Sequence, residues 1–161
     1  MVSDKDNLVI SADSPHNSEC LELLAQLRAE LSDKYPDELR GTPLIPEDLT
    51  VGGATFLVAG ELVGCGAIRP LAPGVAEVKR MFVVQEARGY GVGRAILENL
   101  ETFAREFGYK SIRLEAGLKQ PEAINLYESA RYHRAPCYGP FRENPMSVCF
   151  EKELDASPYK S

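Results

Sequence analysis

A short segment with three glycines at alternate positions between two arginines could bind a phosphate group. It lies between a strand-like segment and a long amphipathic helical pattern, and it reads Arg88-Gly89-Tyr90-Gly91-Val92-Gly93-Arg94. Glycine lets the backbone approach a ligand closely, and the first turn of a helix presents unpaired N–H groups and the positive end of the helix dipole. Arg88 and Arg94 would add charge-assisted hydrogen bonds. The segment therefore predicts a pyrophosphate site, with a plain glycine-rich turn as the alternative.

The same glycines suggest a rival interpretation, the G-x-G-x-x-G fingerprint of a dinucleotide-binding site. In this chain the glycines stand at positions 89, 91 and 93, and the segment follows a predicted hairpin in the middle of the chain. Neither feature matches the fingerprint. The segment therefore fits the pyrophosphate of a different cofactor better than that of a nicotinamide dinucleotide.

Hydrophobic periodicity places this segment within an alternating order of strands and helices. Helical spacing of apolar residues predicts helices that begin at Ser14-Pro15 and that cover 91–107 and 121–129, and Gly108 should end the second helix. Strands are expected at 7–10, 55–59, 62–69, 75–84, 111–116 and 147–154, and the segment 35–50 reads as an irregular connection. The order predicts one α/β domain over residues 1–161, with a mixed sheet and helices on both faces.

Composition argues against several classes of function. The chain has 161 residues, a net charge of −6 and a pI of about 5.0, which disfavour binding to nucleic acid or to an anionic membrane. The longest apolar stretch, 56–68, is interrupted by Glu61, and the amino-terminal MVSDKDN lacks the charged and apolar parts of a signal peptide. We therefore expect a cytoplasmic protein.

The cysteine pattern predicts neither a metal site nor disulfides. Cys20, Cys65, Cys137 and Cys149 form no C-x-x-C pair, and the chain has only two histidines. Reduced thiols are expected in the cytoplasm. Cys137 and Cys149 are accordingly expected to be small apolar side chains rather than nucleophiles that carry an acyl group.

Two motifs together resemble a known family. The R-x-x-G-x-G run of Arg88, Gly91 and Gly93, which follows the strand segment 77–83, resembles the acetyl-CoA signature of the GNAT N-acetyltransferases. The segment 120–128, QPEAINLYE, is similar to the A-x-x-L-Y-E helix of that family. The predicted order of elements is also that of the GNAT fold, so the resemblance covers essentially the whole chain. It implies an α/β GNAT fold with a mixed, mostly antiparallel sheet, and acetyl-CoA as the co-substrate.

The resemblance also implies which residues would hold the cofactor. The backbone of Met81, Phe82 and Val83 would pair with the pantetheine arm, and residues 88–94 would bind the pyrophosphate. Gln120 stands where many members have an asparagine that contacts the pantetheine. Arg131 stands where many members have glycine, so it must adopt a left-handed conformation or the helix must end in another way.

By the same resemblance, Glu77 and Tyr127 occupy the positions of the general base and the general acid. Members with a carboxylate base often carry it four residues before the position of Met81, and Tyr127 matches the tyrosine that protonates the leaving thiolate. A glutamate with an ordinary pKa of ~4.3 is too acidic for an efficient base, so partial burial would have to raise its pKa. The alternatives are an ion pair between Glu77 and Lys79 and a core position for Tyr127. Glu115 is a second carboxylate candidate.

The resemblance predicts an N-acetyltransferase that moves an acetyl group directly to a primary amine in a ternary complex. We expect a small-molecule acceptor, and the acidic chain favours a cationic one. The alternatives are a protein or peptide acetyltransferase and a non-catalytic acetyl-CoA sensor. Relatives are often dimers, so a homodimer is also considered. Tyr35, Glu38, Tyr138 and Phe141 are the candidate contacts to the acceptor.

Overall fold

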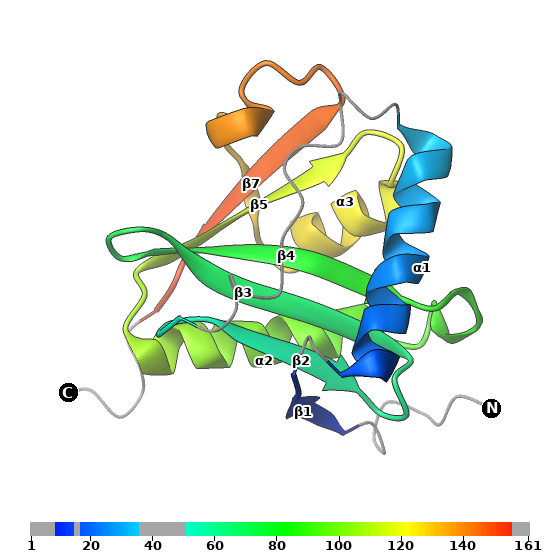
Figure 1. The fold of residues 1–161 in the computed structure, drawn as a ribbon. Helices are drawn as coiled ribbons and strands as arrows, with labels where there is room; N and C mark the ends of the chain where they lie inside the picture. Colours follow the sequence, from blue (N-terminus) through cyan, green and yellow to red (C-terminus); the bar gives the residue numbers. More distant parts are fainter. Residues whose placement is uncertain (1–8, 15–16, 36–50, 156–161) are drawn as a thin grey trace.

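The computed structural model describes residues 9–14, 17–35 and 51–155. These residues form a seven-stranded sheet in the order β1-β2-β3-β4-β5-β7-β6, in which every neighbouring pair is antiparallel except β4 and β5. One helix, α1, crosses one face of the sheet, and α2 and α3 cover the other (Figure 1). The structure therefore confirms the predicted mixed, mostly antiparallel sheet with helices on both faces.

The strands are β1 (Ile10–Ala12), β2 (Thr55–Ala59), β3 (Gly64–Ala72), β4 (Val75–Val83), β5 (Ser111–Gly117), β6 (His133–Arg134) and β7 (Ser147–Glu153). The helices are α1 (Ser18–Lys34), α2 (Val92–Phe107) and α3 (Pro121–Ser129). Among the described residues, none of the helices is long and apolar enough to cross a membrane.

Each face of the sheet has its own hydrophobic core. On one face, α1 packs Leu23 and Leu27 against Phe56 of β2 and Phe82 of β4. The predicted stripe of α2 forms the other core with Ile68 of β3 and Leu114 of β5, and its buried members are Ile96, Leu97, Leu100 and Ala104. Burial of apolar area on both faces stabilises the sheet and fixes the helices over it.

The boundaries differ from the sequence prediction where local chemistry outweighs periodicity. The first strand covers Ile10–Ala12 rather than 7–10, of which 7 and 8 lie outside the described residues. The first helix begins at Ser18 rather than near Ser14, because the Asn17 side chain caps it by accepting from the Glu19 N–H at 2.8 Å. Strand β3 continues through Pro70, where a register irregularity accommodates the missing N–H.

A bulge in β4 and its short pairing with β5 open the sheet. Cys65 of β3 faces Phe82, whereas Ala67 faces Lys79, so β4 carries one extra residue in this interval. Arg80 in this bulge has a φ of 58°. Strands β4 and β5 pair from Val75–Ser111 only as far as Val78–Leu114. The later half of β4 therefore bends away from β5, as a bulged strand does, and leaves space between the two strands.

The prediction of reduced thiols is wrong for one pair, because Cys137 and Cys149 form a disulfide. The Ala135 N–H donates to the Cys149 carbonyl at 3.0 Å, which brings the chain after β6 alongside β7. The Cα atoms of the two cysteines then lie 5.1 Å apart, a distance that a disulfide spans. Spacing in the sequence does not reveal this neighbourhood, because β6 has only two residues and shows no periodicity.

Candidate active site

A cavity of about 620 Å³ opens where β4 and β5 diverge. Its walls come from α1, β4, the glycine-rich segment, β5 and α3. All but one of the predicted cofactor-binding residues line it, namely Met81, Phe82, Val83, Arg88, Gly89, Gly91, Val92, Gly93, Arg94 and Gln120. The exception is Tyr90, which is 55% exposed and not part of the wall. Residues separated by up to forty positions thus meet at one cavity.

The glycine-rich segment turns sharply into α2 at the edge of this cavity. Gly89 and Gly91 have φ values of 87° and 84°, and Gly91 caps α2 without a side-chain hydrogen bond. The first N–H groups of a helix have no acceptor within the helix. Gly93 in this first turn packs closely on α3, since a Cβ there would lie 3.3 Å from Leu126 Cδ2. The segment therefore offers backbone donors and a positive dipole end to an anion.

The arginines of this segment fasten it to neighbouring elements. Arg88 Nε donates to the Val83 carbonyl, and Arg88 Nη2 donates to Glu30 of α1, both at 2.8 Å. Arg94 Nη2 donates to the Ser129 hydroxyl at the end of α3. Both guanidinium groups also line the cavity, so they hold its walls together and place positive charge beside the glycines.

Sequence reasoning missed Arg80, which also lines the cavity. Burial, with the nearby charge of Arg28, lowers the pKa of its guanidinium below the usual value. The signal in the sequence that could have identified Arg80 was a basic residue between Val78 and Phe82, two apolar positions of a buried strand. The bulge gives that residue its direction, and a bulge leaves no mark in the periodicity of β4.

Tyr127 is a core residue that also lines the large cavity. Its ring packs against Tyr132 and Phe150, with centroids 6.0 and 5.9 Å away, and its side chain is only 5% exposed. The same residue lines the large cavity. Burial, followed by the negative charge of Glu115, raises the pKa of Tyr127 well above its ordinary value. Tyr127 is therefore protonated at neutral pH and lies at the cavity wall.

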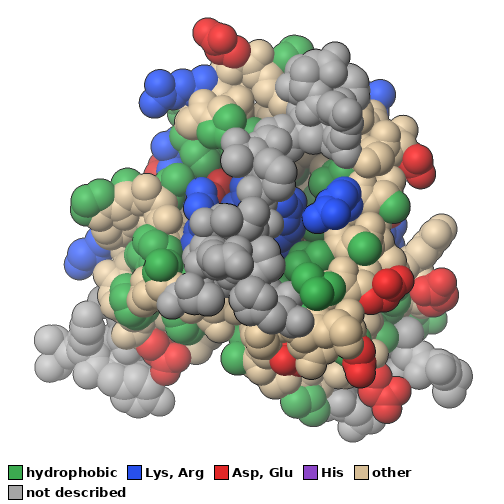
Figure 2. Space-filling model, viewed as in Figure 1, with side chains coloured by type: hydrophobic (Ala, Val, Ile, Leu, Met, Phe, Trp, Pro, Cys, Tyr) green, Lys and Arg blue, Asp and Glu red, His purple; other side chains and the backbone are tan. Residues whose placement is uncertain are grey.

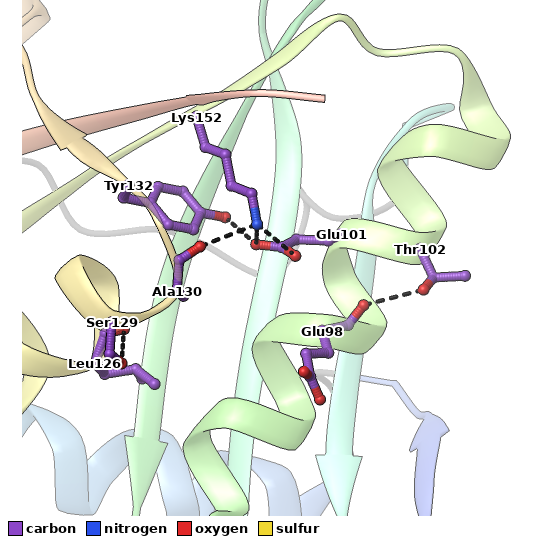
Figure 3. A network of polar contacts seen from close by, with 8 residues as sticks. All are labelled: Glu98, Glu101, Thr102, Leu126, Ser129, Ala130, Tyr132 and Lys152. Carbon is purple, nitrogen blue, oxygen red and sulfur yellow. Dashed lines mark hydrogen bonds and ion pairs between the residues drawn. The ribbon is translucent and has the colours of Figure 1, made fainter. Parts of the chain in front are cut away.

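A buried polar cluster fixes the end of α3, which carries Tyr127. Tyr132 donates to Glu101 Oε2 at 2.8 Å, and Lys152 Nζ lies 3.2 Å from both oxygens of Glu101. Lys152 also donates to the Ala130 carbonyl at 3.0 Å. Figure 3 shows these groups converging from α2, β7 and the chain that follows α3. We call Glu101, Tyr132 and Lys152 the Glu101 cluster.

Immediately before Tyr132, the chain leaves α3 in the left-handed conformation that the sequence analysis considered for Arg131. Arg131 has a φ of 71°, so it does adopt the left-handed conformation that glycine takes more easily. Its backbone N–H donates to the Glu128 carbonyl at 3.1 Å, and the Tyr132 N–H donates to the Tyr127 carbonyl at 3.0 Å. These bonds close the helix and direct Tyr132 into the core.

Glu77 is buried and surrounded by donors. Arg69 Nε contacts its Oε1 at 3.0 Å, and the Tyr138 hydroxyl donates to its Oε2 at 2.7 Å. Lys79 Nζ lies 3.8 Å from the same carboxylate, so the considered ion pair with Lys79 is present, although Arg69 is closer. Burial and the charge of Glu77 raise the pKa of Tyr138, which therefore keeps the proton that it donates.

Glu115 is a second carboxylate at the large cavity. It lies on β5 two residues beyond Arg113, the partner of Glu77 in the register. The Ser147 hydroxyl donates to Glu115 Oε2 at 2.7 Å. Burial raises the pKa of Glu115 above 4.5, partly offset by that hydrogen bond and by the charge of Lys79. A raised pKa makes a carboxylate a more effective base near neutral pH.

A second pocket of about 460 Å³ adjoins the large cavity, and Glu77, Lys79 and Phe141 line both. Tyr138 and Phe141 form one wall of this second pocket, with ring centroids 5.6 Å apart. The disulfide described above holds the loop that carries them, because Cys137 and Cys149 pack in the same small cluster. The structure thus brings two of the predicted acceptor contacts to a pocket beside Glu77.

The other two predicted acceptor contacts do not lie in this second pocket. Tyr35 lines the large cavity, where its hydroxyl accepts from the Lys119 N–H at 2.9 Å. It packs so closely on Gly117 that a Cβ there would lie 1.9 Å from the phenol oxygen, so only glycine fits. Gln120 Oε1 accepts from the Gly117 N–H at 3.1 Å in the same corner. Glu38 lies outside the described residues.

Comparison with known proteins agrees with this geometry. The model of the acetyltransferase (GNAT) family matches residues 19–131. An IAA acetyltransferase from Azospirillum brasilense is 38% identical over 92% of this chain and 99% of its own length. A crystal structure named as an acyl-CoA N-acyltransferase, from Klebsiella pneumoniae, has a TM-score of 0.77 and 31% identity, with 92% of this chain and 99% of that one covered. A GNAT acetyltransferase from Elizabethkingia anophelis with acetyl-CoA bound shares the fold, with a TM-score of 0.66 and 18% identity over 93% of this chain and all of that one. The chain therefore belongs to the acetyltransferase (GNAT) family, which confirms the expected enzyme class and acetyl-CoA as its co-substrate.

Proposed function

We propose that this enzyme transfers an acetyl group from acetyl-CoA to a primary amine of a small molecule, by direct attack within a ternary complex. The observation that carries the proposal is the junction of two cavities at Glu77, Lys79 and Phe141. One cavity has an anion-binding edge at the glycine-rich segment, where the pyrophosphate of acetyl-CoA would bind. The other, at about 460 Å³, has the volume of a site for a small molecule.

The cofactor would enter the large cavity with its pyrophosphate at the glycine-rich segment. Its pantetheine arm would lie along the end of β4, which β5 does not cover. The Val84 N–H donates to the Val63 carbonyl at 2.9 Å, and in an antiparallel pair successive residues alternate in direction. The backbone groups of Val83 therefore point away from β3, which agrees with its carbonyl accepting from Arg88. The backbone N–H groups of Phe82 and Val83 are the two candidate donors to the thioester oxygen, and this direction favours Val83.

The reaction requires three proton movements and one exchange of bonds. The ammonium of the acceptor loses a proton to Glu77, and the free amine attacks the carbonyl carbon of the thioester. A carbon–nitrogen bond forms, the carbon–sulfur bond breaks, and Tyr127 gives its proton to the departing thiolate. The second proton that the acylated nitrogen must lose then returns to the Tyr127 phenolate, and Glu77 releases its proton to solvent. The raised pKa of Tyr127 keeps the phenol protonated until the thiolate appears, and burial in the same cavity makes the thiolate a stronger base as well.

The cysteines support direct transfer rather than an acyl-enzyme. Cys20 and Cys65 are buried, and burial raises the pKa of these thiols to about 11 and about 12. Cys137 and Cys149 are joined to each other. Because the nucleophilic form of cysteine is the thiolate, none of the four is placed to carry the acetyl group.

The test is acceptor-dependent release of free CoA thiol from acetyl-CoA. A panel of amino acids, polyamines, aminoglycosides and lysine peptides would be tested as acceptors with wild type, Tyr127→Phe and Tyr109→Phe. Tyr109→Phe is the matched control because Tyr109 is also a buried tyrosine and lines neither cavity. We expect release with a small amine that depends on Tyr127 and not on Tyr109. Release with lysine peptides alone would favour a peptide acetyltransferase, and tight acetyl-CoA binding without any release would favour the sensor.

A further inference from the structure

The second pocket carries the opposite charge to the chain as a whole. Among the described residues that line it, four are basic, Arg69, Lys79, Arg113 and Arg142, and two are acidic, Glu77 and Glu151. The chain itself has a net charge of −6. Figure 2 shows basic side chains gathered near the middle of the face drawn in Figure 1, and acidic ones mostly at its periphery. The local field therefore attracts an anion, although the overall charge attracts cations.

The charges of this pocket form an ordered row across four strands. Arg69 faces Glu77 between β3 and β4, Glu77 faces Arg113 between β4 and β5, and Arg113 faces Glu151 between β5 and β7. Glu77 is well matched, since Arg69 lies 3.0 Å away. Arg113 is poorly matched, because its Nε lies 3.8 Å from Glu151 Oε2. The row therefore has a tightly paired carboxylate next to a loosely paired guanidinium.

Arg113 is held in place mainly by neutral groups, beside its long ion pair with Glu151. Its Nη2 donates to the Pro136 carbonyl at 2.6 Å, and its guanidinium lies over the Tyr138 ring, 5.1 Å from the centroid. Its Nε is buried and has no hydrogen-bond partner among the described residues. Carbonyl and ring contacts fix the direction of a guanidinium without neutralising its charge, and the 3.8 Å ion pair with Glu151 is too long for a hydrogen bond. Such a group is preorganised for a carboxylate, which matches its planar fork.

Apolar side chains complete the same pocket. Leu71, Val75, Pro140 and Phe141 line it beside Tyr138, and Lys79 Nζ lies 5.3 Å from the centroid of the Phe141 ring. Arg142, at the same loop, is exposed. The pocket thus offers a carboxylate next to the large cavity, guanidinium groups farther along the row, and an apolar wall between loop and sheet.

We propose that this pocket binds an acceptor that carries a carboxylate beside its amine, that is, an amino acid with an apolar or aromatic side chain. The acceptor carboxylate contacts Arg113 and Arg142, its amine lies at Glu77, and its side chain packs on Tyr138 and Phe141. This inference rests on the proposed acetyl transfer, and it replaces the cationic acceptor that the overall charge suggested with a zwitterionic one.

The test compares acceptors that differ only in the carboxylate. L-Phenylalanine, L-phenylalaninamide and phenethylamine form one matched set, and L-leucine, L-leucinamide and isoamylamine form a second. We expect kcat/KM for the amino acid of at least one set to exceed that of its amide and amine by about 10-fold or more, the contribution of a charge-assisted hydrogen bond. Equal or faster release of CoA with the amides and amines would uphold acetyl transfer and overturn this inference.

Variants locate the effect in the pocket. Arg113→Gln and Arg142→Gln should raise KM for the amino acid by about 10-fold and leave KM for its amide unchanged. Arg134→Gln is the matched control, because Arg134 is 60% exposed, pairs with Glu128 and does not line the pocket. Circular dichroism confirms folding, and the exposed Arg142 provides a variant that keeps the core intact. An equal loss for all acceptors in both pocket variants would contradict a carboxylate site.

A binding measurement separates failure of this inference from failure of the proposed function. If none of the six acceptors releases CoA, calorimetry with the amino acids on the CoA-saturated protein decides. Binding that is lost in Arg113→Gln and Arg142→Gln but kept in Arg134→Gln would support the carboxylate site and reject acetyl transfer to these amines. Absence of binding would reject the carboxylate site.

Discussion

Replacement of Lys152 by methionine should destabilise the fold strongly, because it leaves the charge of Glu101 buried. Lys152 makes three hydrogen bonds, two to Glu101 and one to the Ala130 carbonyl. The side chain of Glu101 is only 7% exposed, and without Lys152 the hydrogen bond from Tyr132 is the one that it retains among the described residues. Loss of one partner of a buried ion pair costs about 3–5 kcal/mol. Because the side chain of Lys152 is itself 20% exposed, we expect about 3 kcal/mol.

Urea unfolding followed by far-ultraviolet circular dichroism measures this free energy, since the chain has no tryptophan to report by fluorescence. A loss of about 3 kcal/mol corresponds to a fall in Tm of about 6–12 °C for a chain of this length. Lys110→Met, at an exposed position, is the matched control, and it should change the free energy of unfolding by less than about 0.5 kcal/mol. A loss below about 1 kcal/mol for Lys152→Met would refute the reasoning.

A double variant separates the buried charge from the loss of packing. Glu101→Gln keeps an acceptor for Tyr132 and removes the charge. If the uncompensated charge causes the destabilisation, Lys152→Met combined with Glu101→Gln should be more stable than Lys152→Met alone. An additive loss in the double variant would show that the two side chains act independently.

Three further perturbations test the site. Tyr127→Phe should lower the rate of CoA release by about 100-fold or more, the usual contribution of a general acid, with Tyr109→Phe unchanged; a wild-type rate in Tyr127→Phe would remove Tyr127 from the mechanism. Glu115 has a pKa that burial raises above its unfolded value of 4.5, so its ionisation opposes folding increasingly as pH rises above that value. Urea unfolding should therefore show that Glu115→Gln gains stability over wild type between pH 4.5 and pH 7, and no change in this difference would contradict the raised pKa. Replacement of Cys137 and Cys149 by serine opens a loop with a sequence separation of 12, and it should cost about 2–3 kcal/mol of unfolding free energy. It should also weaken acceptor binding more than acetyl-CoA binding. Intact mass after alkylation under denaturing conditions checks whether the disulfide is present. Wild type shows two free thiols if the disulfide is formed and four if it is not.

The sequence predicts those parts of the molecule that depend on local pattern. The stripe of α2 and its end at Gly108, where φ is 102°, follow from helical spacing and a glycine stop. The extent of β2 and of α3 was predicted to the residue, because turn residues and Pro121 mark their ends. The part of the candidate site proposed for the cofactor is also predictable, because the glycine-rich segment follows β4 closely in the sequence.

The parts that the sequence does not reveal depend on register and on distant contacts. Periodicity identified Lys79 as the partner of Glu77, but Arg69 reaches it through the β3–β4 register and Tyr138 through a loop 61 residues away. The extra residue at Arg80 and the disulfide depend likewise on how strands align. The net charge of the chain does not reveal the positive charge of the second pocket, because the four basic side chains that line it come from four separate segments.

Initial-rate kinetics with both substrates varied test the central claim most directly. Direct transfer in a ternary complex predicts double-reciprocal lines that intersect. It also predicts that protein incubated with acetyl-CoA alone forms no covalent acyl intermediate, so that its intact mass does not rise by the ~42 Da of one acetyl group in place of one hydrogen. Parallel lines together with an acetylated protein that passes its acetyl group to the amine would contradict the account.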